Sequence, residues 1–363
     1  NLLNMYVKKD VFQSKDIVFT NSSSEAIEMF FDFISYKQTS VILPLPCYFK
    51  YDLLACRKKI STLSYYNNIG GIYNVQSDII ADPTIIINNP EAISGKLNTS
   101  EFYSKLELTY PNWQFKLYDF CYLLMDNYNH NEKTYDFLSH SIKQNNIENN
   151  VFIFSPSKDI SLASYRAGVL ISKNEGVLNH AKNIILERYF TLNMYSTFTT
   201  ILYFCILNIG SQIKSADKDK VIENLLFLLK EYGYINKELN QDFFYSFFEY
   251  YTSKVLSFYM SNFDYMIEKN KVFTKETAVI PDAGFSALWK LNRDLPKMDS
   301  IISTIQNTAL NFNSNIFSGY YNGGQINSWD YLYPNSYLIR LNSSIPFDIL
   351  KNQINVLNKI YKI

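Results

Sequence analysis

Short apolar runs alternate with amphipathic stretches along the first half of the chain. Six of these runs are rich in β-branched and aromatic residues and end at polar or turn-forming residues, which predicts strands. The predicted strands are Ser40–Pro46, Lys58–Tyr66, Thr84–Pro90, Phe115–Asp119, Val151–Ser155 and Ala167–Ser172. Between them, the apolar spacing predicts helices at Ser24–Ser35 and Ser100–Tyr110. Buried-looking strands that alternate with helices predict an α/β fold with a mostly parallel sheet.

The hydrophobic pattern changes after about Asn174. Long helical stretches continue from there to about Lys269, and an α+β region follows. The elements predicted in that region are strands at Phe285–Leu291 and Ser336–Asn342, a helix near Asp299–Leu310 and a last helix from Phe347. Two domains that share one cleft are therefore expected.

Composition excludes several classes of function. Lysine plus arginine and aspartate plus glutamate both number 34, so no nucleic-acid partner is expected. Hydrophobic residues make up 47% of the chain, which is ample for a folded core. The longest apolar run, around Ile201–Ile209, is too short to span a bilayer and predicts a buried helix, so no membrane partner is expected. Four cysteines without a C-x-x-C pair and three histidines without ligand spacing predict no metal site and favour a reduced, cytoplasmic location.

Polar residues that could carry chemistry follow the predicted strands. In an α/β sheet, ligands bind beyond the carboxyl ends of the strands. The polar residues at these ends are Asn88, Asn89, Asp119, Tyr122, Ser155 and Lys158. Lys158 lies in a run of small and hydroxylated residues, with Arg166 eight positions later, a setting that a surface lysine does not need. A solvated loop after a buried strand is the alternative interpretation.

The loop TNSSSEA, at Thr20–Ala26, opens a predicted helix with three consecutive serines. Free backbone N–H groups and the helix dipole attract an anion such as phosphate to a helix N-terminus, and hydroxyl groups add donors. An ordinary N-cap with Glu25 in the first turn explains the same residues.

Taken in chain order, these residues resemble the fold-type I pyridoxal-phosphate-dependent aminotransferases, in particular the class I/II aminotransferase family. Each motif is short, but the ordered set covers nearly the whole chain. The similar motifs are S-x-x-K with R-x-G at Ser155, Lys158, Arg166 and Gly168, D-x-x-Y at Asp119–Tyr122, N-P-x-N-P-T-G at Asn89–Gly95, P-x-Y at Pro46–Tyr48, the small-domain strand with glycine, an aromatic residue and tryptophan at Asp282–Leu291, and the arginine-bearing strand at Tyr337–Asn342.

The resemblance implies catalytic roles for three residues. Lys158 is expected to form a Schiff base with the aldehyde of pyridoxal 5'-phosphate and then to act as the general base that moves the substrate proton. Asp119 is expected to pair with the pyridine nitrogen and keep it protonated, and Tyr122 to donate to the phenolic oxygen.

The resemblance also implies which residues hold the cofactor and the substrate. Ser23, Ser24, Ser155 and Arg166 are expected to grip the phosphate. Tyr48 is expected to stack on the cofactor ring, for which core packing is the alternative. Arg340 is expected to bind the α-carboxylate of the substrate in a bidentate fork.

Several residues depart from the family pattern. The asparagine that binds the phenolic oxygen in the family falls on Ala92, so either Asn89 or Asn88 replaces it through a shifted turn, or that hydrogen bond is absent. For Asn89, a turn before Pro90 is the structural alternative. Ser22 and Ser164 stand where the family has glycines. Upstream of Thr20 the chain is too short for the family's N-terminal arm.

The fold implied is a large domain at residues 15–260, with a mostly parallel seven-stranded-type sheet flanked by helices, and a smaller α+β domain at 261–363 plus 1–14. The chain between Gly168 and Gly284 is longer than usual for the family, which predicts a helical insertion at about 205–255. This insertion contains the aromatic run at Asp242–Tyr251; core packing is its first interpretation, and a partner surface or a substrate lid is the alternative.

The function implied is transfer of an amino group from an amino acid to a 2-oxo acid by a homodimer. The same Lys158 and Asp119 would serve a lyase, a cyclase or an oxygen-using enzyme of a specialised pathway, and Ala92 favours that alternative. A ligand-binding protein without catalysis is the third possibility, and the intact set of site residues argues against it.

Overall fold

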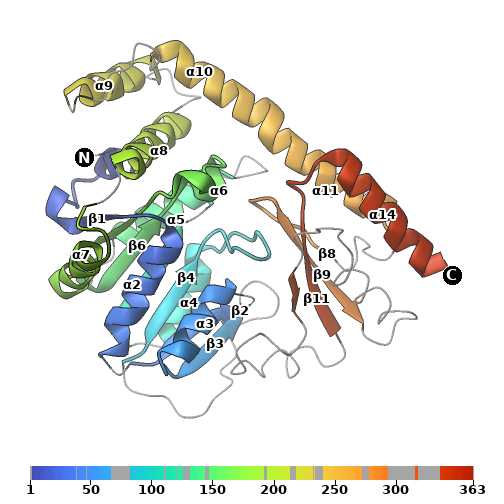
Figure 1. Ribbon diagram of the computed structural model, residues 1–363, viewed down its shortest axis with the longest axis horizontal. Coiled ribbons are helices and arrows are strands. Elements are labelled where there is room, and N and C mark those ends of the chain that lie inside the picture. Colours follow the sequence, from blue (N-terminus) through green and yellow to red (C-terminus); the bar gives the residue numbers. More distant parts are fainter. Residues whose placement is uncertain are drawn as a thin grey trace.

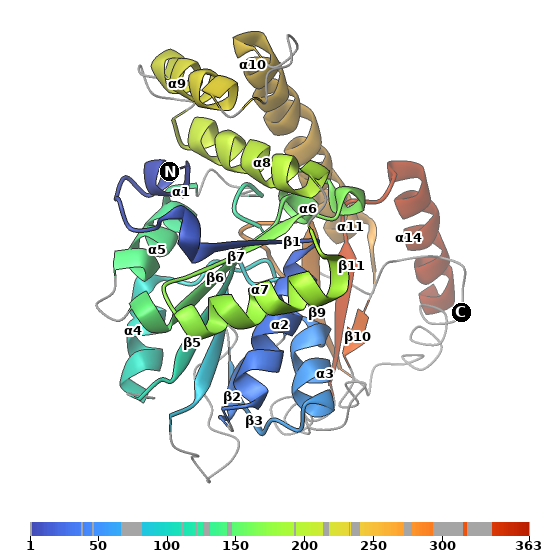
Figure 2. The same cartoon turned by 60° about the vertical axis from the view of Figure 1, so that its left-hand side comes forward.

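The computed structural model describes most of the chain. The described residues are 2–37, 39–45, 47–66, 82–109, 112–120, 122–125, 131–143, 147–191, 194–212, 218–231, 233, 240–271, 278–292, 315–317 and 336–362. They form a large mixed sheet with helices on both faces and a smaller sheet beside it (Figures 1 and 2).

The large sheet has seven strands in the order β1-β7-β6-β5-β4-β2-β3. Their bounds are β1 Ile17–Thr20, β2 Val41–Leu45, β3 Thr62–Tyr66, β4 Thr84–Asn88, β5 Phe115–Phe120, β6 Asn150–Phe154 and β7 Gly168–Ser172. Strands β3, β2, β4, β5 and β6 run parallel, and β7 is antiparallel to both β6 and β1. The sheet is therefore mostly parallel, and the α/β prediction is confirmed.

Both faces of this sheet are buried because its strands are apolar at successive positions. Ile86 packs into the core on one face, whereas Ile85 and Ile87 pack into the core on the other, as the two-residue period of a strand requires. The helices of the first face are α2 Ser23–Ser35, α3 Phe49–Arg57 and α7 Glu175–Tyr189. Those of the second face are α1 Leu2–Tyr6, α4 Ser100–Thr109, α5 Asn131–Lys143, α8 Met194–Gln212, α9 Lys218–Glu231 and α10 Gln241–Tyr250. Short helical turns lie at η1 Ser14–Asp16, η2 Ile147–Asn149, α6 Pro156–Asp159 and η3 Ala163–Tyr165.

A long helical run leads from the large sheet to the smaller one (Figure 1). It consists of α10, the π-helical segment η4 at Tyr251–Leu256, and α11 at Ser257–Lys269. One face of this run is buried in the core on the second face of the large sheet. The residues of that face are Phe244, Phe248 and Tyr251, at spacings of four and three residues. One face of the aromatic run at Asp242–Tyr251 thus packs into the core, whereas Tyr250 is 64% exposed.

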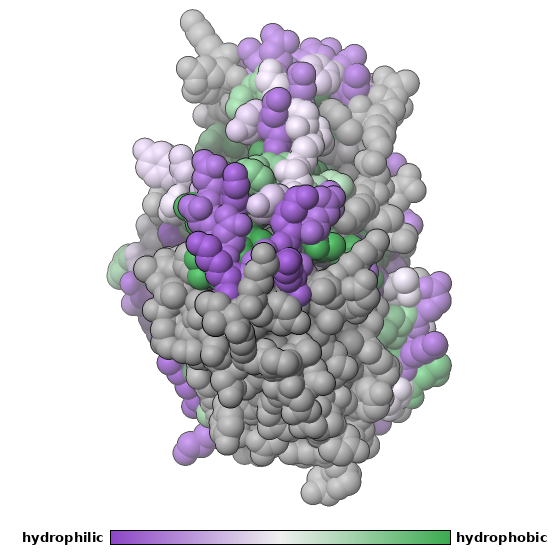
Figure 3. Space-filling view, turned by 90° about the vertical axis from the view of Figure 1, so that its right-hand side faces the viewer, coloured by the Kyte–Doolittle hydropathy of each residue, from purple (hydrophilic) through white to green (hydrophobic). Residues whose placement is uncertain are grey.

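The smaller sheet is antiparallel, in the order β10-β11-β9-β8. Its strands are β8 Ala278–Val279, β9 Ser286–Asn292, β10 Asn315–Phe317 and β11 Ser336–Asn342. The last helix, α14 at Phe347–Lys362, packs beside α11 and buries Leu350, Ile354 and Leu357. On the side that Figure 3 faces, the described surface shows mainly hydrophilic residues with hydrophobic ones between them.

All six strands predicted in the first half are present, as are the helices at Ser24–Ser35 and Ser100–Tyr110 within one or two residues. Strand β1 was not predicted. The helix expected near Asp299–Leu310 lies outside the described residues. Among the described helices, none is long and apolar enough to cross a membrane.

The division into domains at residue 260 stays a prediction. The contacts of the first residues favour one change to it. Leu3, Tyr6 and Val7 are buried in the same core as α8, and the side chain of Asn208 on α8 donates to the carbonyl of Leu2 at 2.9 Å. These contacts place the first residues against the large sheet, whereas the sequence-based division grouped 1–14 with the smaller domain.

Candidate active site

Sheet topology brings the predicted site residues of the large sheet to one edge of it. Strands β4, β5 and β6 are parallel neighbours, with Asn88 opposite Asp119 and Phe120 opposite Phe154. The residues that follow these strands therefore emerge side by side. At the end of β1, Thr20 lies opposite Gly168 of β7, which adds the serine loop to the same edge.

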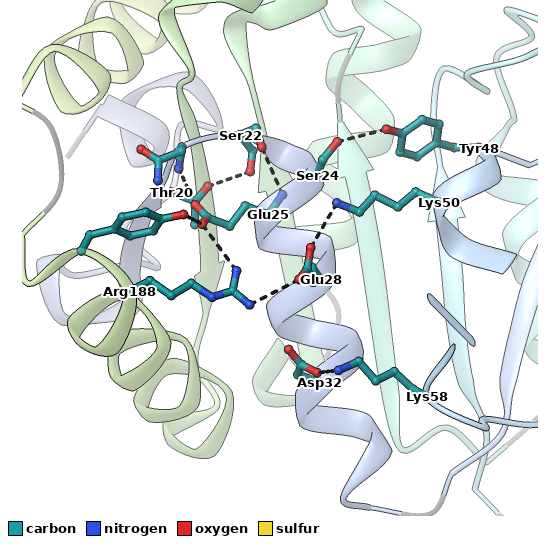
Figure 4. A network of polar contacts seen from close by, with 12 residues as sticks. Thr20, Ser22, Ser24, Glu25, Glu28, Asp32, Tyr48, Lys50, Lys58 and Arg188 are labelled. Carbon is teal, nitrogen blue, oxygen red and sulfur yellow. Dashed lines mark hydrogen bonds and ion pairs between the residues drawn. The ribbon is translucent and has the colours of Figure 1, made fainter. Parts of the chain in front are cut away.

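The serine loop forms the N-terminus of α2. Ser22 is the N-cap, and its Oγ accepts the N–H of Glu25 at 3.1 Å. Ser23 is the first helical residue, and the Oγ of Ser24 lies 3.0 Å from the hydroxyl oxygen of Tyr48 (Figure 4). Ser23, Ser24 and Tyr48 thus lie at the positive end of a 13-residue helix, where the backbone N–H groups favour an anion.

Side chains on α7 and α3 fix the orientation of α2 (Figure 4). Arg188 of α7 donates to Glu28 at 3.3 Å, and Lys50 of α3 donates to the same carboxylate at 3.3 Å. Although burial raises the pKa of Glu28, the hydrogen bonds from Lys50 and Arg188 hold it below its ordinary value. The carboxylate of Glu25 accepts the hydroxyl of Tyr189 at 2.7 Å.

Gly168 allows the backbone of β7 to touch the serine loop. A Cβ atom at this position would lie 2.5 Å from the carbonyl carbon of Ser22 and 2.7 Å from the backbone nitrogen of Ser23. Both neighbours are backbone atoms, so a side chain at residue 168 would displace the N-terminus of α2. The glycine of the R-x-G motif is therefore explained by close approach to the loop.

Replacing Gly168 with alanine should lower the free energy of unfolding by about 1–3 kcal/mol, as overpacking does elsewhere. Urea unfolding of the variant measures this loss. Gly176→Ala is the control, because its added Cβ would meet only side-chain atoms, the nearest at 3.2 Å. Equal stability of the Gly168 variant and the parent would contradict this account of the loop.

Lys158 lies in α6, directly after β6. Ser155 is the N-cap of this short helix; its Oγ accepts the N–H of Ser157 at 3.2 Å and lies 2.9 Å from the carbonyl of Ala167. The side chain of Lys158 is exposed, and its Nζ lies 5.7 Å from the centre of the Phe285 ring. The amine is thus presented at the edge of the sheet, with Phe285 beside it.

Arg166 is held by its backbone. It has a left-handed conformation with φ of 50° at the end of η3, and Ser196 of α8 donates to its carbonyl at 2.7 Å. The side chain of Arg166 is exposed. Gly168, two residues later, touches the serine loop, so the Arg166 side chain begins near the N-terminus of α2.

Asp119 is the last residue but one of β5 and is buried, with a relative exposure of 3%. The hydroxyl of Tyr51 on α3 donates to its Oδ2 in a short hydrogen bond. The side chain of Asn88 donates to the carbonyl of Asp119 at 3.0 Å. Tyr51 was not predicted as a site residue, although its ring lies 5.6 Å from that of Tyr48, the N-cap of α3.

The asparagines of the Asn89–Gly95 loop are engaged with the backbone. The Oδ1 of Asn89 accepts the N–H of Asn98 at 2.9 Å, and the Oδ1 of Asn88 accepts the N–H of Ala92 at 2.7 Å. Both side chains are buried. In this structure they shape the loop in which Ala92 stands.

Tyr122 belongs to an apolar wall beside Lys158. Its ring packs edge-on against Phe285 at 5.9 Å, and Met125 and Tyr259 complete the cluster. Gly284 has φ of 83°, and its N–H donates to the carbonyl of Met125 at 2.6 Å. This wall connects the D-x-x-Y loop to the start of β9, and neither Phe285 nor Met125 was predicted as part of the site.

Arg340 is placed by its strand. It lies in β11, opposite Leu288 of β9 and Asn315 of β10. Its side chain lies outside the described part of the structure, so its approach to the site stays a prediction.

Comparison with known proteins agrees with this architecture. No protein-family model and no curated protein sequence matches the chain. Among solved structures, it is similar to an aspartate aminotransferase from Thermotoga maritima, with 13% identity, a TM-score of 0.63, and coverage of 99% of this chain and 80% of the other. Apo-BacF from Bacillus subtilis is 11% identical with a TM-score of 0.64, covering 99% and 79%. An aspartate aminotransferase variant from Thermus thermophilus is 12% identical with a TM-score of 0.61, covering 96% and 81%.

Proposed function

We propose that the chain, which has the fold of the pyridoxal-phosphate-dependent aminotransferases, transfers the amino group of an amino acid to a 2-oxo acid. The observation that supports the proposal is that three groups follow or end strands on the same side of the sheet. They are the exposed amine of Lys158, the buried carboxylate of Asp119, and the N-terminus of α2 with Gly168 against it.

These groups fit pyridoxal 5'-phosphate. The α2 N-terminus, with Ser23 and Ser24, suits a phosphate, and Ser155 and Arg166 would add to the grip. The carboxylate of Asp119 suits a protonated pyridine nitrogen, and Tyr48 would stack on the ring. Asn89 would contribute to cofactor binding indirectly, because its side chain accepts the N–H of Asn98 and so shapes the loop.

The cofactor, when bound, supplies a ring that accepts the electrons left at the substrate Cα after its proton is removed. Lys158 would hold the cofactor through its amine and then carry the proton on Nζ between Cα and the cofactor. Tyr51 donates to Oδ2 of Asp119 and so holds the carboxyl group in one orientation. Tyr122 would donate its hydroxyl proton to the phenolic oxygen, and Arg340 would bind the substrate carboxylate.

A homodimer is part of the proposal. Exposed apolar side chains gather around the end of α7 and the start of α8, with Phe190 84% exposed and Met194 and Tyr195 both 68% exposed. Leu186 and Tyr165 are also more than half exposed. Such a set next to Arg166 favours a partner surface close to the site.

One observation favours a second candidate function, in which the enzyme acts as a lyase, a cyclase or an oxygen-using enzyme on an amino acid. The Oδ1 atoms of Asn88 and Asn89 both accept backbone N–H groups of the loop that follows β4. The Nδ2 of Asn88 donates to the carbonyl of Asp119, and Ala92 has no side-chain amide. The phenolic oxygen would then lack an amide donor, which would alter the electronics of the cofactor.

An absorption spectrum of the protein with pyridoxal 5'-phosphate tests the proposal, followed by addition of single amino acids. A visible band that converts to that of the pyridoxamine form with one amino acid is the expected result. A band that persists while oxygen is consumed would favour the second candidate. Absence of any band would leave a ligand-binding protein without this chemistry.

A further inference from the structure

Asp159 follows Lys158 in the chain but points the other way. Lys158 is exposed, whereas Asp159 has a relative exposure of 0%. Successive helical residues are about 100° apart, so α6 presents the lysine to the site and the carboxylate to the interior. A fully buried carboxylate requires several hydrogen-bond donors, and the segments that supply these donors are the ones it fixes in place.

Backbone groups of the Tyr122–Met125 loop, which begins at the last residue of the D-x-x-Y motif, donate to Asp159. The N–H of Leu123 donates to Oδ2 and the N–H of Leu124 donates to Oδ1, both at 3.0 Å. The backbone of Met125 adds a further hydrogen bond. These three residues directly follow Tyr122, so one carboxylate fastens the whole loop to the helix that carries Lys158.

Two tyrosines also interact with this carboxylate. Tyr203 of α8 donates its hydroxyl to Oδ2 in a short hydrogen bond. Tyr251 of η4 is buried, and the charge of Asp159 adds to burial in raising the pKa of its phenol. The titratable groups around Asp159 are therefore Tyr203 and Tyr251, with Lys158 next to it on its own helix.

We propose that Asp159 is a positioning residue of the proposed site: its carboxylate fixes the Tyr122–Met125 loop, and with it the Tyr122 side chain, relative to Lys158. The inference rests on the proposed function, since Tyr122 and Lys158 matter together only if they act on one cofactor. Asp159 itself is fully buried and bonded to the loop backbone and Tyr203, so it would act through Tyr122 and not by contact with substrate or cofactor.

The charge state of Asp159 gives the tie a pH dependence. Burial raises the pKa of this carboxyl to about 7, and the hydrogen bonds from Tyr203 and the loop oppose that rise. Its folded pKa lies above its ordinary value of 3.8, so its contribution to stability falls as pH rises from about 4 to about 7. Within the folded protein, only the ionised carboxylate can accept from all of its donors at once, because a protonated carboxyl oxygen becomes a donor itself. The loop geometry that places Tyr122 therefore requires the ionised form, above a pH of about 7, although this form adds less to overall stability.

Hydrogen exchange on the cofactor-free protein tests the tie without any catalysis. In Asp159→Asn, an NH₂ group replaces one of the two carboxylate oxygens. This NH₂ group cannot accept a hydrogen bond from the loop N–H groups or from the hydroxyl of Tyr203. The N–H groups of Leu123 and Leu124 should then exchange about tenfold faster or more, as loss of one hydrogen bond predicts. Asp16→Asn is the matched control, because Asp16 is also buried and hydrogen-bonded but lies far along the chain, in η1. It should leave these two amides unchanged.

Kinetics with pyridoxal 5'-phosphate test the functional half. The kcat of Asp159→Asn should fall about 100-fold with little change in KM, as a misplacement of about 1 Å does. The kcat of the parent should decline as pH falls through about 7, and the Asn variant should lack this limb. Tyr203→Phe, which keeps the volume, should move the limb to higher pH, and it also serves if the Asn variant fails to fold.

Two results would overturn the inference. Unchanged exchange at Leu123 and Leu124 in the Asn variant would show that Asp159 does not hold the loop. Faster exchange with unchanged kcat and pH profile would show a purely structural tie. Failure of the parent protein to bind the cofactor would instead overturn the proposed function. Hydrogen exchange is measured without cofactor, so it would still show whether Asp159 holds the loop.

Discussion

Lys158→Ala should lower kcat at least about 10⁴-fold while leaving the fold intact. The physical reason is that the side chain is exposed at the end of a four-residue helix, whereas the same amine has to bind the cofactor and move the proton. Its removal costs little buried surface but takes away the reacting group. The loss should therefore appear in kcat and not in the melting temperature.

Covalent labelling provides the measurement. Reduction with borohydride in the presence of pyridoxal 5'-phosphate, followed by peptide mass spectrometry, should place the adduct on Lys158 in the parent and nowhere in the variant. Lys182→Ala is the control, because Lys182 is an exposed lysine on α7 and should retain both adduct and activity. Full activity in the Lys158 variant would rule out the proposed mechanism.

The sheet and the position of the site could be predicted from the sequence because both follow from local patterns. All five residues of Thr84–Asn88 are buried, and such continuous apolar runs are typical of strands in a parallel sheet that is covered on both faces. Once the strands are parallel, the residues after them meet at one edge. Asp119 and Lys158 are brought to that edge by this rule alone.

Strand β1 could not be predicted, because its structure depends on a distant partner. It has four residues with two half-buried positions, and it pairs with β7 about 150 residues later along the chain. Asp159 illustrates the same limit in the site. A carboxylate beside a lysine resembles a surface ion pair in sequence, and only the packing of α6 against α8 and the Tyr122–Met125 loop makes it a buried acceptor.

The asparagines were harder to predict for a different reason. A motif records which residue types are present, whereas the direction of a side chain depends on which backbone groups lack partners. The N–H groups of Ala92 and Asn98 are satisfied by Asn88 and Asn89, so the loop uses these amides for its own shape.

Asp119→Asn should lower kcat on the order of 10³-fold, which is the scale for loss of one preorganised electrostatic partner. Asparagine has nearly the same shape and can still accept the hydroxyl of Tyr51, so the fold of the buried β5 end should persist and only the negative charge is lost. Tyr51→Phe is the matched comparison: it keeps the charge but releases Oδ2, and it should cost much less. A cofactor analogue methylated at the ring nitrogen separates the two causes, since its permanent positive charge needs no carboxylate to maintain it. Activity of the Asn variant should rise with that analogue relative to the ordinary cofactor, whereas an equal defect with both would mean that Asp119 acts through packing and not through charge.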